Sequence, residues 1–375
     1  MGSVYQSLGL YEIAELQKRE ALEILRRESG DETLEVGRSL ESLSGLAFDR
    51  ANYESAEALA REALTIYQRL HEGEHLDIAS ALSDVGVALS GQGDAKGARE
   101  LYVDALAMAR RLPDVEERDL EGFVRRLAIV LDELGDEQAE SLYRESLELC
   151  RRIYGEEHAR VAFALDNLAI FFDLSGHPKQ AEPLYRESLA MLRRIYGEKH
   201  VEVAQTMGNL ADFLLDVRGP REGGSAADVE EMESLLHGAL QINRRFRPQH
   251  PIVGDNLSSL AALESQRADH RKAETLAREA LGIYRAKLSE SHSRTASQKV
   301  QLGEILLSQG RPREAQSLAL EAFRALRSPD RNPDDLEEAL GLLVRTSDEL
   351  GRKEAAKEYR ALLEELSKDG RLADG

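Results

Sequence analysis

Residues 158–196 read HARVAFALDNLAIFFDLSGHPKQAEPLYRESLAMLRRIY, and the spacing of their apolar residues decides the fold. The first half repeats apolar residues every three or four positions, on one face of a helix, at Val161, Leu165, Leu168, Ala169 and Phe172. Gly176-His177-Pro178 interrupts this pattern and predicts a turn. The second half returns to the same spacing at Ala181, Leu184, Tyr185, Ser188, Leu189 and Leu192. The stretch therefore predicts two antiparallel helices, each apolar on one face.

The same helix pair returns along almost the whole chain, marked by one position early in each second helix. This position, which we call the anchor, is Ala14, Ala56, Ala98, Ala139, Ala181, Met232, Ala273, Ala315 and Ala355. Successive anchors are 42, 42, 41, 42, 51, 41, 42 and 40 residues apart. Helices approach closely only where side chains are short, so we expect the anchors at helix crossings. A fixed period of this length is typical of stacked repeats, and it predicts an all-α solenoid.

Irregularities in the period suggest how the chain is organised. We expect residues 1–366 to form one elongated domain, because a repeat extends its core along an axis. Residues 218–228, rich in Gly and small residues, account for the long step and predict a flexible insertion loop. Residues 367–375 predict a disordered tail. Met1 to Leu8 supply only a stub of a first helix, as expected of a fragment cut from a longer chain.

Composition narrows the classes of partner. The formal charge is −20, which disfavours binding to nucleic acid or to an anionic membrane surface. The lone Cys150 excludes an intrachain disulfide, and no apolar run approaches the length of a transmembrane helix. We therefore expect a cytoplasmic protein. Cys150 fits a small buried residue better than a nucleophile, since the pattern places no His and acid beside it.

Several short sequence motifs that recur along the chain resemble a known repeat. Leu-Tyr-Arg-Glu-Ser-Leu occurs at 142–147 and 184–189, Tyr-Gly-Glu-x-His-x-x-Val-Ala at 154–162 and 196–204, and Asn-Leu-Ala at 167–169 and 209–211. These motifs resemble the tetratricopeptide repeat, in the longer form of roughly 42 residues found in kinesin light chains and many bacterial proteins. The resemblance implies a right-handed α-solenoid with about eight full repeats and a partial N-terminal one.

Two histidine patterns suggest a metal site, but the repeat explains both of them better. His71-Glu-Gly-Glu-His75 matches the zinc motif His-Glu-x-x-His, but it coincides with the turn between repeats and contains a glycine. His75, His158, His200, His250 and His292 form a column at the start of successive first helices, which indicates a structural role in the turn. We therefore expect no metal, no cofactor and no enzyme activity; a metal-dependent enzyme stays as a remote alternative.

The resemblance implies that the first helices line a concave groove, where a peptide would bind. Asparagines in this groove can hydrogen-bond to a peptide backbone, and aspartates there would attract a basic segment. A solvated polar face without a partner is the competing interpretation. The candidate groove residues are Arg125, Arg126, Asp132, Asp166, Asn167, Asp173, Asn209, Asp212 and Asp255.

We therefore expect a non-enzymatic scaffold that binds a protein or peptide segment. The alternative is a regulatory or sensory module of a larger bacterial protein, such as one attached to a kinase or a nucleotide-binding switch. The sequence decides neither the partner nor the oligomeric state.

Overall fold

The computed structural model describes residues 11–50, 52–248, 250–288, 290, 292–327 and 333–373. Within these residues the regular structure is helical throughout. In the first half of the chain the helices are α2 (Tyr11–Ser29), α3 (Leu34–Asp49), α4 (Tyr53–Leu70), α5 (Leu76–Gln92), α6 (Ala95–Arg111), α7 (Glu117–Glu133), α8 (Gln138–Tyr154) and α9 (Ala159–Leu174). They are followed by α10 (Pro178–Tyr196), α11 (Val201–Arg218), the 3-10 turn η1 (Pro220–Glu222), α12 (Ala226–Phe246), α13 (Pro251–Gln266), α14 (His270–Lys287), α15 (Ser293–Ser308), α16 (Pro312–Leu326), α17 (Pro333–Glu349) and α18 (Lys353–Ala373).

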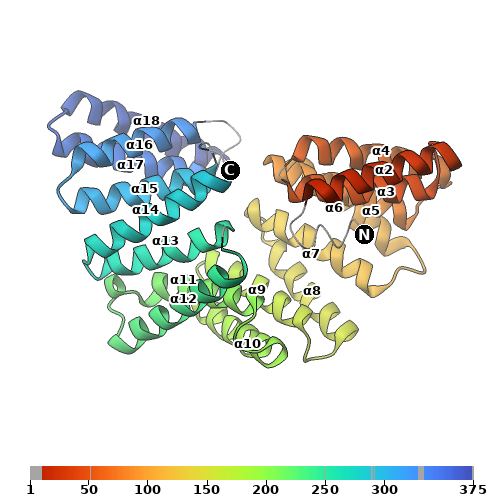
Figure 1. Ribbon diagram of the computed structural model, residues 1–375, viewed down its shortest axis with the longest axis horizontal. Helices are drawn as coiled ribbons and strands as arrows, with labels where there is room; N and C mark the ends of the chain where they lie inside the picture. Colours follow the sequence, from red (N-terminus) through yellow and green to blue (C-terminus); the bar gives the residue numbers. More distant parts are fainter. Residues whose placement is uncertain are drawn as a thin grey trace. The chain divides into compact units, whose positions relative to one another are not determined.

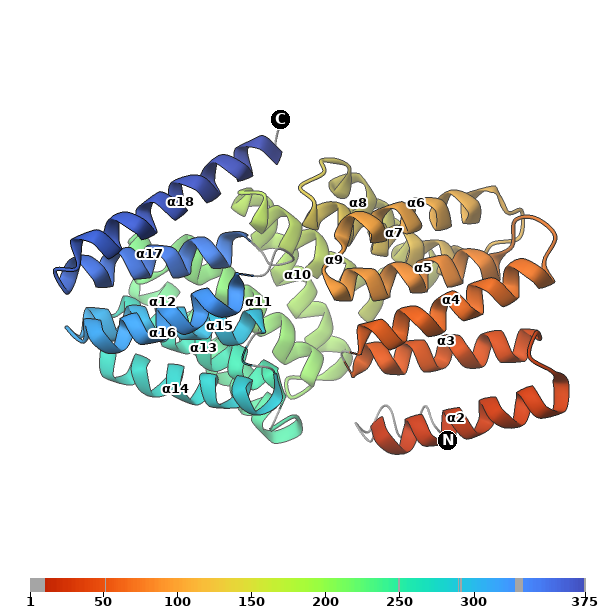
Figure 2. The ribbon, with the colours of Figure 1, turned by 90° about the horizontal axis from the view of Figure 1, so that it is seen from above.

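The chain divides into two compact units, Met1–Phe171 and Phe172–Gly375. In the first unit the pairs α3 with α4, α5 with α6 and α7 with α8 pack closely, and each pair also packs on the next (Figure 1). The second unit repeats this order in the pairs α11 with α12, α13 with α14, α15 with α16 and α17 with α18 (Figure 2). The predicted all-α solenoid of helix pairs is confirmed. The stub predicted at Met1 to Leu8 lies outside the described residues.

The anchors are buried where neighbouring helices meet. The first eight, from Ala14 to Ala315, are at most 1% exposed. The last anchor needs a correction, because Ala355 is only half-buried and Ala356 is 0% exposed. The amide of Ala356 donates to the carbonyl of Arg352, just as the amide of Ala315 donates to that of Arg311. The anchor of the last repeat is therefore Ala356, which makes the final step 41 residues.

The histidine column caps the first helices. In each case Nδ1 of the histidine accepts the backbone N–H two residues later, at 3.1 to 3.2 Å, in His75, His158, His200, His250 and His292. An N-cap acceptor satisfies one of the amides that a helix start leaves unpaired. Tyr154 and Tyr196 stack on the capping rings of His158 and His200. The predicted structural role of this column is confirmed.

Glycines at three first-helix positions admit tyrosine rings from the paired second helices. A Cβ on Gly254 would lie 2.7 Å from the ring of Tyr284, closer than packed atoms can approach. Gly86 stands in the same relation to Tyr102, and Gly37 to Tyr67. These glycines leave room for aromatic rings at helix crossings. In other repeats an alanine occupies the corresponding position.

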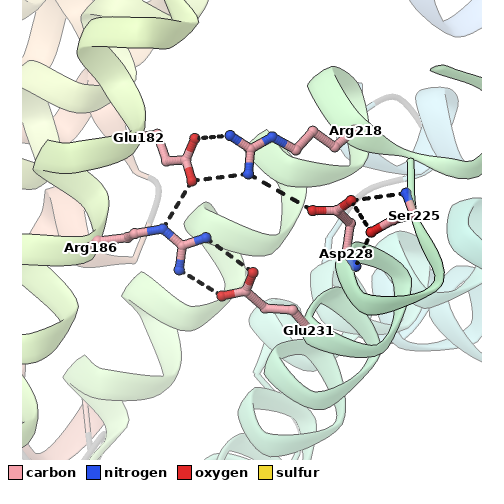
Figure 3. Close-up of polar contacts among 6 residues, drawn as sticks. All are labelled: Glu182, Arg186, Arg218, Ser225, Asp228 and Glu231. Carbon is pink, nitrogen blue, oxygen red and sulfur yellow. Dashed lines mark hydrogen bonds and ion pairs between the residues drawn. The ribbon is translucent and has the colours of Figure 1, made fainter. Parts of the chain in front are cut away.

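The insertion at 218–228 is more regular than the sequence predicted. Helix α11 continues to Arg218, η1 follows, and Ser225 starts α12 with a capping box, in which Ser225 N donates to Asp228 at 2.9 Å and Asp228 N donates to Ser225 Oγ at 3.2 Å. Figure 3 shows the charged side chains that surround this start. Arg186 of α10 pairs with both carboxylate oxygens of Glu231, at 2.6 and 3.0 Å. Arg218 pairs with Glu182 at 2.5 Å. The inserted 3-10 turn itself packs against α11 and α13, where the Arg221 amide donates to Gln266 Oε1 at 3.3 Å, and the ion pairs join its two flanking helices to α10.

The last helix also differs from its predicted extent. Helix α18 runs to Ala373, past residue 366, where the repeat domain was expected to end and a disordered tail to begin. Residues 374 and 375 lie outside the described part. Among the described residues, no helix combines the length and the apolar character that crossing a bilayer requires.

Candidate functional site

The second unit contains a pocket of about 950 Å³ on its first helices. Side chains of α13, α15 and α17 form most of its lining, and Tyr284 of α14 and Leu363 of α18 complete it. Acidic side chains outnumber basic ones in this lining. The acidic residues are Glu304, Asp335, Glu337 and Glu338, and the basic residues are Arg294 and Arg345.

Hydrogen bonds between neighbouring first helices order the polar groups of the pocket. Gln301 of α15 donates to the carbonyl of Ser258 on α13 at 3.0 Å, and the Ser258 hydroxyl donates back to Gln301 Oε1 at 3.1 Å. Arg345 of α17 pairs with Glu304 of α15. Ser297 donates to Asp335 at 2.8 Å. Each first helix is thus linked to the next by a polar contact.

Asp255 connects the pocket to the aspartates that the sequence singled out. Its Oδ1 accepts the hydroxyl proton of Tyr284 at 2.7 Å, and its Oδ2 lies 3.3 Å from Arg294 Nη1. Both partners line the pocket. Burial and the negative charge of Asp255 raise the pKa of Tyr284, so its hydroxyl stays a donor. The carboxylate therefore fixes one wall of the pocket.

Asp212 carries the strongest electrostatic perturbation among these aspartates. Burial, together with the charges of Asp216, Asp255 and Asp173, raises its pKa to about 7, against a hydrogen bond from Ser259. The side chain nevertheless keeps an exposed surface, so solvent screening reduces this shift. Burial also raises the pKa of Asp173 and of Asp216. These carboxylates lie close enough to repel one another, and a cation placed among them would relieve that repulsion.

Asp173 and Asn209 occupy the same unit with local partners. Asp173 accepts the hydroxyl of Tyr185 at 3.4 Å. Asn209 Oδ1 accepts the amide of Gln205, one turn earlier on α11, at 3.1 Å. The half-buried Asn209 side chain thus has one interaction within its own helix.

The remaining candidates lie in the first unit. Arg126 donates to Ser83 at 2.6 Å and to Asp84 at 3.1 Å, so it links two first helices. Arg125 pairs with Glu121 at 3.5 Å, and Asp132 accepts the hydroxyl of Tyr143 at 3.2 Å. Burial raises the pKa of Asp132.

Asp166 and Asn167 complete the set. Asp166 is only 8% exposed, so it presents little surface to a partner, while Asn167 is half-buried. The nine candidates thus fall into two sets: Arg125, Arg126, Asp132, Asp166 and Asn167 in the first unit, and Asp173, Asn209, Asp212 and Asp255 in the second.

Sequence reasoning missed most of the pocket. It did not extend the charged groove positions to α15 and α17, and so left out Arg294, Glu304 and Arg345. The signal was available, because Glu304 follows the small residue Gly303 just as Asp212 follows Ala211. Counting one further period from Glu304 leads to Arg345. The pairing between these two side chains required the structure.

Comparison with known proteins identifies the repeat. Residues 1–69, 45–111 and 123–194 match one form of the tetratricopeptide repeat, and residues 257–294 match another. Together these matches cover more than half of the chain. No curated protein matches this sequence.

Several solved structures have a similar fold. The apo form of the quorum sensor NprR from B. thuringiensis is 13% identical, with a TM-score of 0.61 over 87% of this chain and 86% of NprR. A Rap protein complexed with Competence and Sporulation Factor is 14% identical, with a TM-score of 0.56 over 90% of this chain and 99% of the Rap protein. A STAND signal transduction ATPase with a tetratricopeptide repeat sensor, from Pyrococcus horikoshii, is 14% identical, with a TM-score of 0.57 over 97% of this chain and 54% of that protein. The matched repeats, the buried anchors and the stacked helix pairs agree: this chain belongs to the tetratricopeptide repeat family.

Proposed function

We propose that the second unit binds a basic segment of a protein partner, without catalysis, along the end of α9 and the polar faces of α11, α13, α15 and α17. We call this surface the acidic groove, and we define it by Asp173, Asp212, Asp216 and Asp255 together with the pocket. The observation that carries the proposal is the raised pKa of Asp212 beside three further carboxylates, at the edge of a pocket with an acidic majority. Lysine and arginine side chains are the natural complement of such a surface.

The size and shape of the pocket suit a polypeptide. A volume of about 950 Å³ accommodates several side chains. The amide and hydroxyl groups of Gln301, Ser258 and Ser297 in its wall would exchange part of their present hydrogen bonds for a peptide backbone. Asn209 extends this set of polar groups along α11. The Rap protein of similar fold was crystallised with Competence and Sporulation Factor, which supports a binding role for such repeats.

Fluorescence anisotropy with labelled peptides tests this function. We expect a lysine- and arginine-rich peptide to bind the full chain more tightly than an acidic peptide of equal length. Asp212→Asn with Asp216→Asn should weaken that binding about tenfold, the equivalent of about 1.4 kcal/mol. Glu230→Gln with Glu222→Gln removes the same charge from exposed positions at and near α12 and serves as the control. Equal binding of both peptides, or equal loss in the control, would contradict the proposal.

A second candidate function is that of a sensor module in a multidomain regulator. The match to the Pyrococcus horikoshii protein favours it, because that protein has a tetratricopeptide repeat sensor and this chain matches about half of its length. In such a protein, ligand binding to the groove would alter an attached catalytic domain. Sequencing the parent gene tests this candidate: a kinase or nucleotide-binding domain in the same reading frame is the expected result.

A further inference from the structure

The turn between α4 and α5 brings together three side chains that can bind a metal ion. His71 Nε2 lies 2.9 Å from Asp77 Oδ2, and His75 Nδ1 lies 3.2 Å from the same oxygen. The two imidazole rings stack with their centres 3.4 Å apart and their planes 7° from parallel. One ligand atom from each residue lies within 4.8 Å of the others. Across the described part of the chain, no other His, Cys, Asp and Glu side chains form such a group.

Equivalent turns show what the repeat itself requires here. In the turns before α9 and α11, a tyrosine stacks on the capping histidine, with ring centres 4.5 Å apart for Tyr154 on His158 and 4.2 Å for Tyr196 on His200. His71 takes the place of that tyrosine. An aromatic ring is therefore sufficient for the turn, and a second imidazole is not needed for the fold.

The residue after the cap distinguishes this turn as well. The position of Asp77 is occupied by Arg160, Glu202, Ile252 and Arg294 in the other turns. Only the turn before α5 combines a ligating side chain at that position with a histidine pair. The substitutions that supply ligands therefore coincide in a single repeat.

The spacing of the donor atoms matches a tetrahedral ion. Zinc binds imidazole nitrogen and carboxylate oxygen at about 2.0 to 2.2 Å, so two tetrahedral ligands lie about 3.3 Å apart. The separations of 2.9 and 3.2 Å at Asp77 are close to this edge length. Imidazole with carboxylate is a donor set for zinc and its late transition-metal neighbours, and calcium and magnesium prefer oxygen alone.

We propose that His71, His75 and Asp77 bind one divalent zinc-class ion, with a coordination position open to water. The side chains of His71 and Asp77 are each 22% exposed and that of His75 is 43% exposed, so an ion can enter from solvent. Binding displaces the amide of Asp77 from His75 Nδ1 and turns the two rings out of their stack, because one ion cannot lie in the planes of two parallel rings 3.4 Å apart. The ion would join the end of α4 to the start of α5.

The site differs from the hydrolytic zinc motif that the sequence resembles. Helix α4 ends at Leu70 and α5 begins at Leu76, so His71 to His75 do not share a helix face. Glu74 pairs with Arg111 of α6 at 2.9 Å. The geometry supports a structural or regulatory ion, and the third ligand, Asp77, lies outside the motif.

Metal titration of the untagged full chain tests this inference. We expect about one equivalent of Zn²⁺ per chain after dialysis, and Co²⁺ should give the intense visible bands of a four-coordinate site. His71→Tyr reproduces the stack found at Tyr154 and Tyr196, so it removes a ligand and keeps the turn. This variant should bind zinc at least about tenfold more weakly, with an unchanged circular dichroism spectrum in EDTA. Absence of binding in the wild type, or equal binding by the variant, would overturn the inference.

A second variant, in which the three ligands are placed in another turn, tests the inference independently. It also applies if His71→Tyr loses helical circular dichroism. Tyr154→His with Arg160→Asp places the same three ligands in the turn before α9. We expect this variant to bind about two equivalents of Zn²⁺, one at each turn. A stoichiometry that stays at one equivalent would overturn the inference, because identical side chains in an equivalent turn should bind alike.

Discussion

Tyr67 of α4 donates its hydroxyl proton to Glu41 Oε2 of α3 at a distance of 2.9 Å. Burial, together with the charges of Asp84 and Asp77, raises the pKa of Glu41 to about 7. The hydrogen bond from Tyr67 opposes this rise and stabilises the carboxylate. The helix pair thus contains an acid that is costly to ionise.

Replacement of Glu41 by glutamine should stabilise the protein at high pH. The folded-state pKa of Glu41 lies above its ordinary value of 4.5, so the folded protein binds the proton more tightly and stability falls as pH rises from about 4.5 to about 7. Glu41→Gln should raise the free energy of unfolding by about 1 to 2 kcal/mol at pH 8, after discounting for solvent, and little at pH 4. Urea denaturation at both pH values measures this, with the exposed Glu23→Gln as control. An equal effect at both pH values would contradict it.

Two glycines of α3 should respond in opposite ways to alanine. A Cβ at Gly37 would overlap the Tyr67 ring, which is fully buried and cannot move aside. Gly37→Ala should lower the free energy of unfolding by about 1 to 3 kcal/mol, the range for overpacking. Gly45 has open space at its Cβ, so Gly45→Ala should raise stability by up to about 1 kcal/mol through helix propensity. Thermal denaturation distinguishes the two, and a shift of the same sign would be inconsistent with this packing.

The thiol of Cys150 should be unreactive in the folded protein. Burial raises its pKa to about 11, and the negative charge of Glu121 adds to the rise. An ordinary thiol has a pKa of about 8.5, so the thiolate fraction near neutral pH falls roughly 300-fold. Reaction with Ellman's reagent should be at least that much slower in buffer than in denaturant. Equal rates would show that the side chain is accessible.

Removal of the capping box at the insertion should loosen the start of α12. Ser225→Ala removes the hydroxyl that accepts the Asp228 amide, and we expect a loss of about 1 kcal/mol. Ser234→Ala, at an exposed position in the same helix, should be neutral or slightly stabilising. Hydrogen exchange of the amides of 226–229 provides a local measurement: faster exchange in Ser225→Ala alone is the expected result.

The sequence predicted the features that repeat and missed those that depend on contacts between repeats. Anchors such as Ala56 and the capping role of His158 follow from one periodic pattern, because every repeat has the same need to bury a helix crossing and to satisfy its amides. The pairing of Arg345 with Glu304 could not be predicted, because no periodic pattern in a single sequence shows which charged side chains of neighbouring repeats meet. The shift from Ala355 to Ala356 was missed because two adjacent alanines fit the period almost equally well, and only the packing chooses between them. The insertion appeared to be a loop because Gly and Pro were visible there, while the charged partners from α10 were distant in sequence.

The buried anchors have a consequence for how such a protein can change over time. The anchors set the distance between neighbouring helices, and a larger or a polar side chain at these buried positions would disturb the packing. Folding therefore permits few substitutions there. The polar faces of the first helices bear little of that constraint, and mutation can alter them one repeat at a time. Duplication or loss of a whole repeat would lengthen or shorten the recognition surface without redesigning its interior. A lineage could in this way acquire new partners while its fold stays the same.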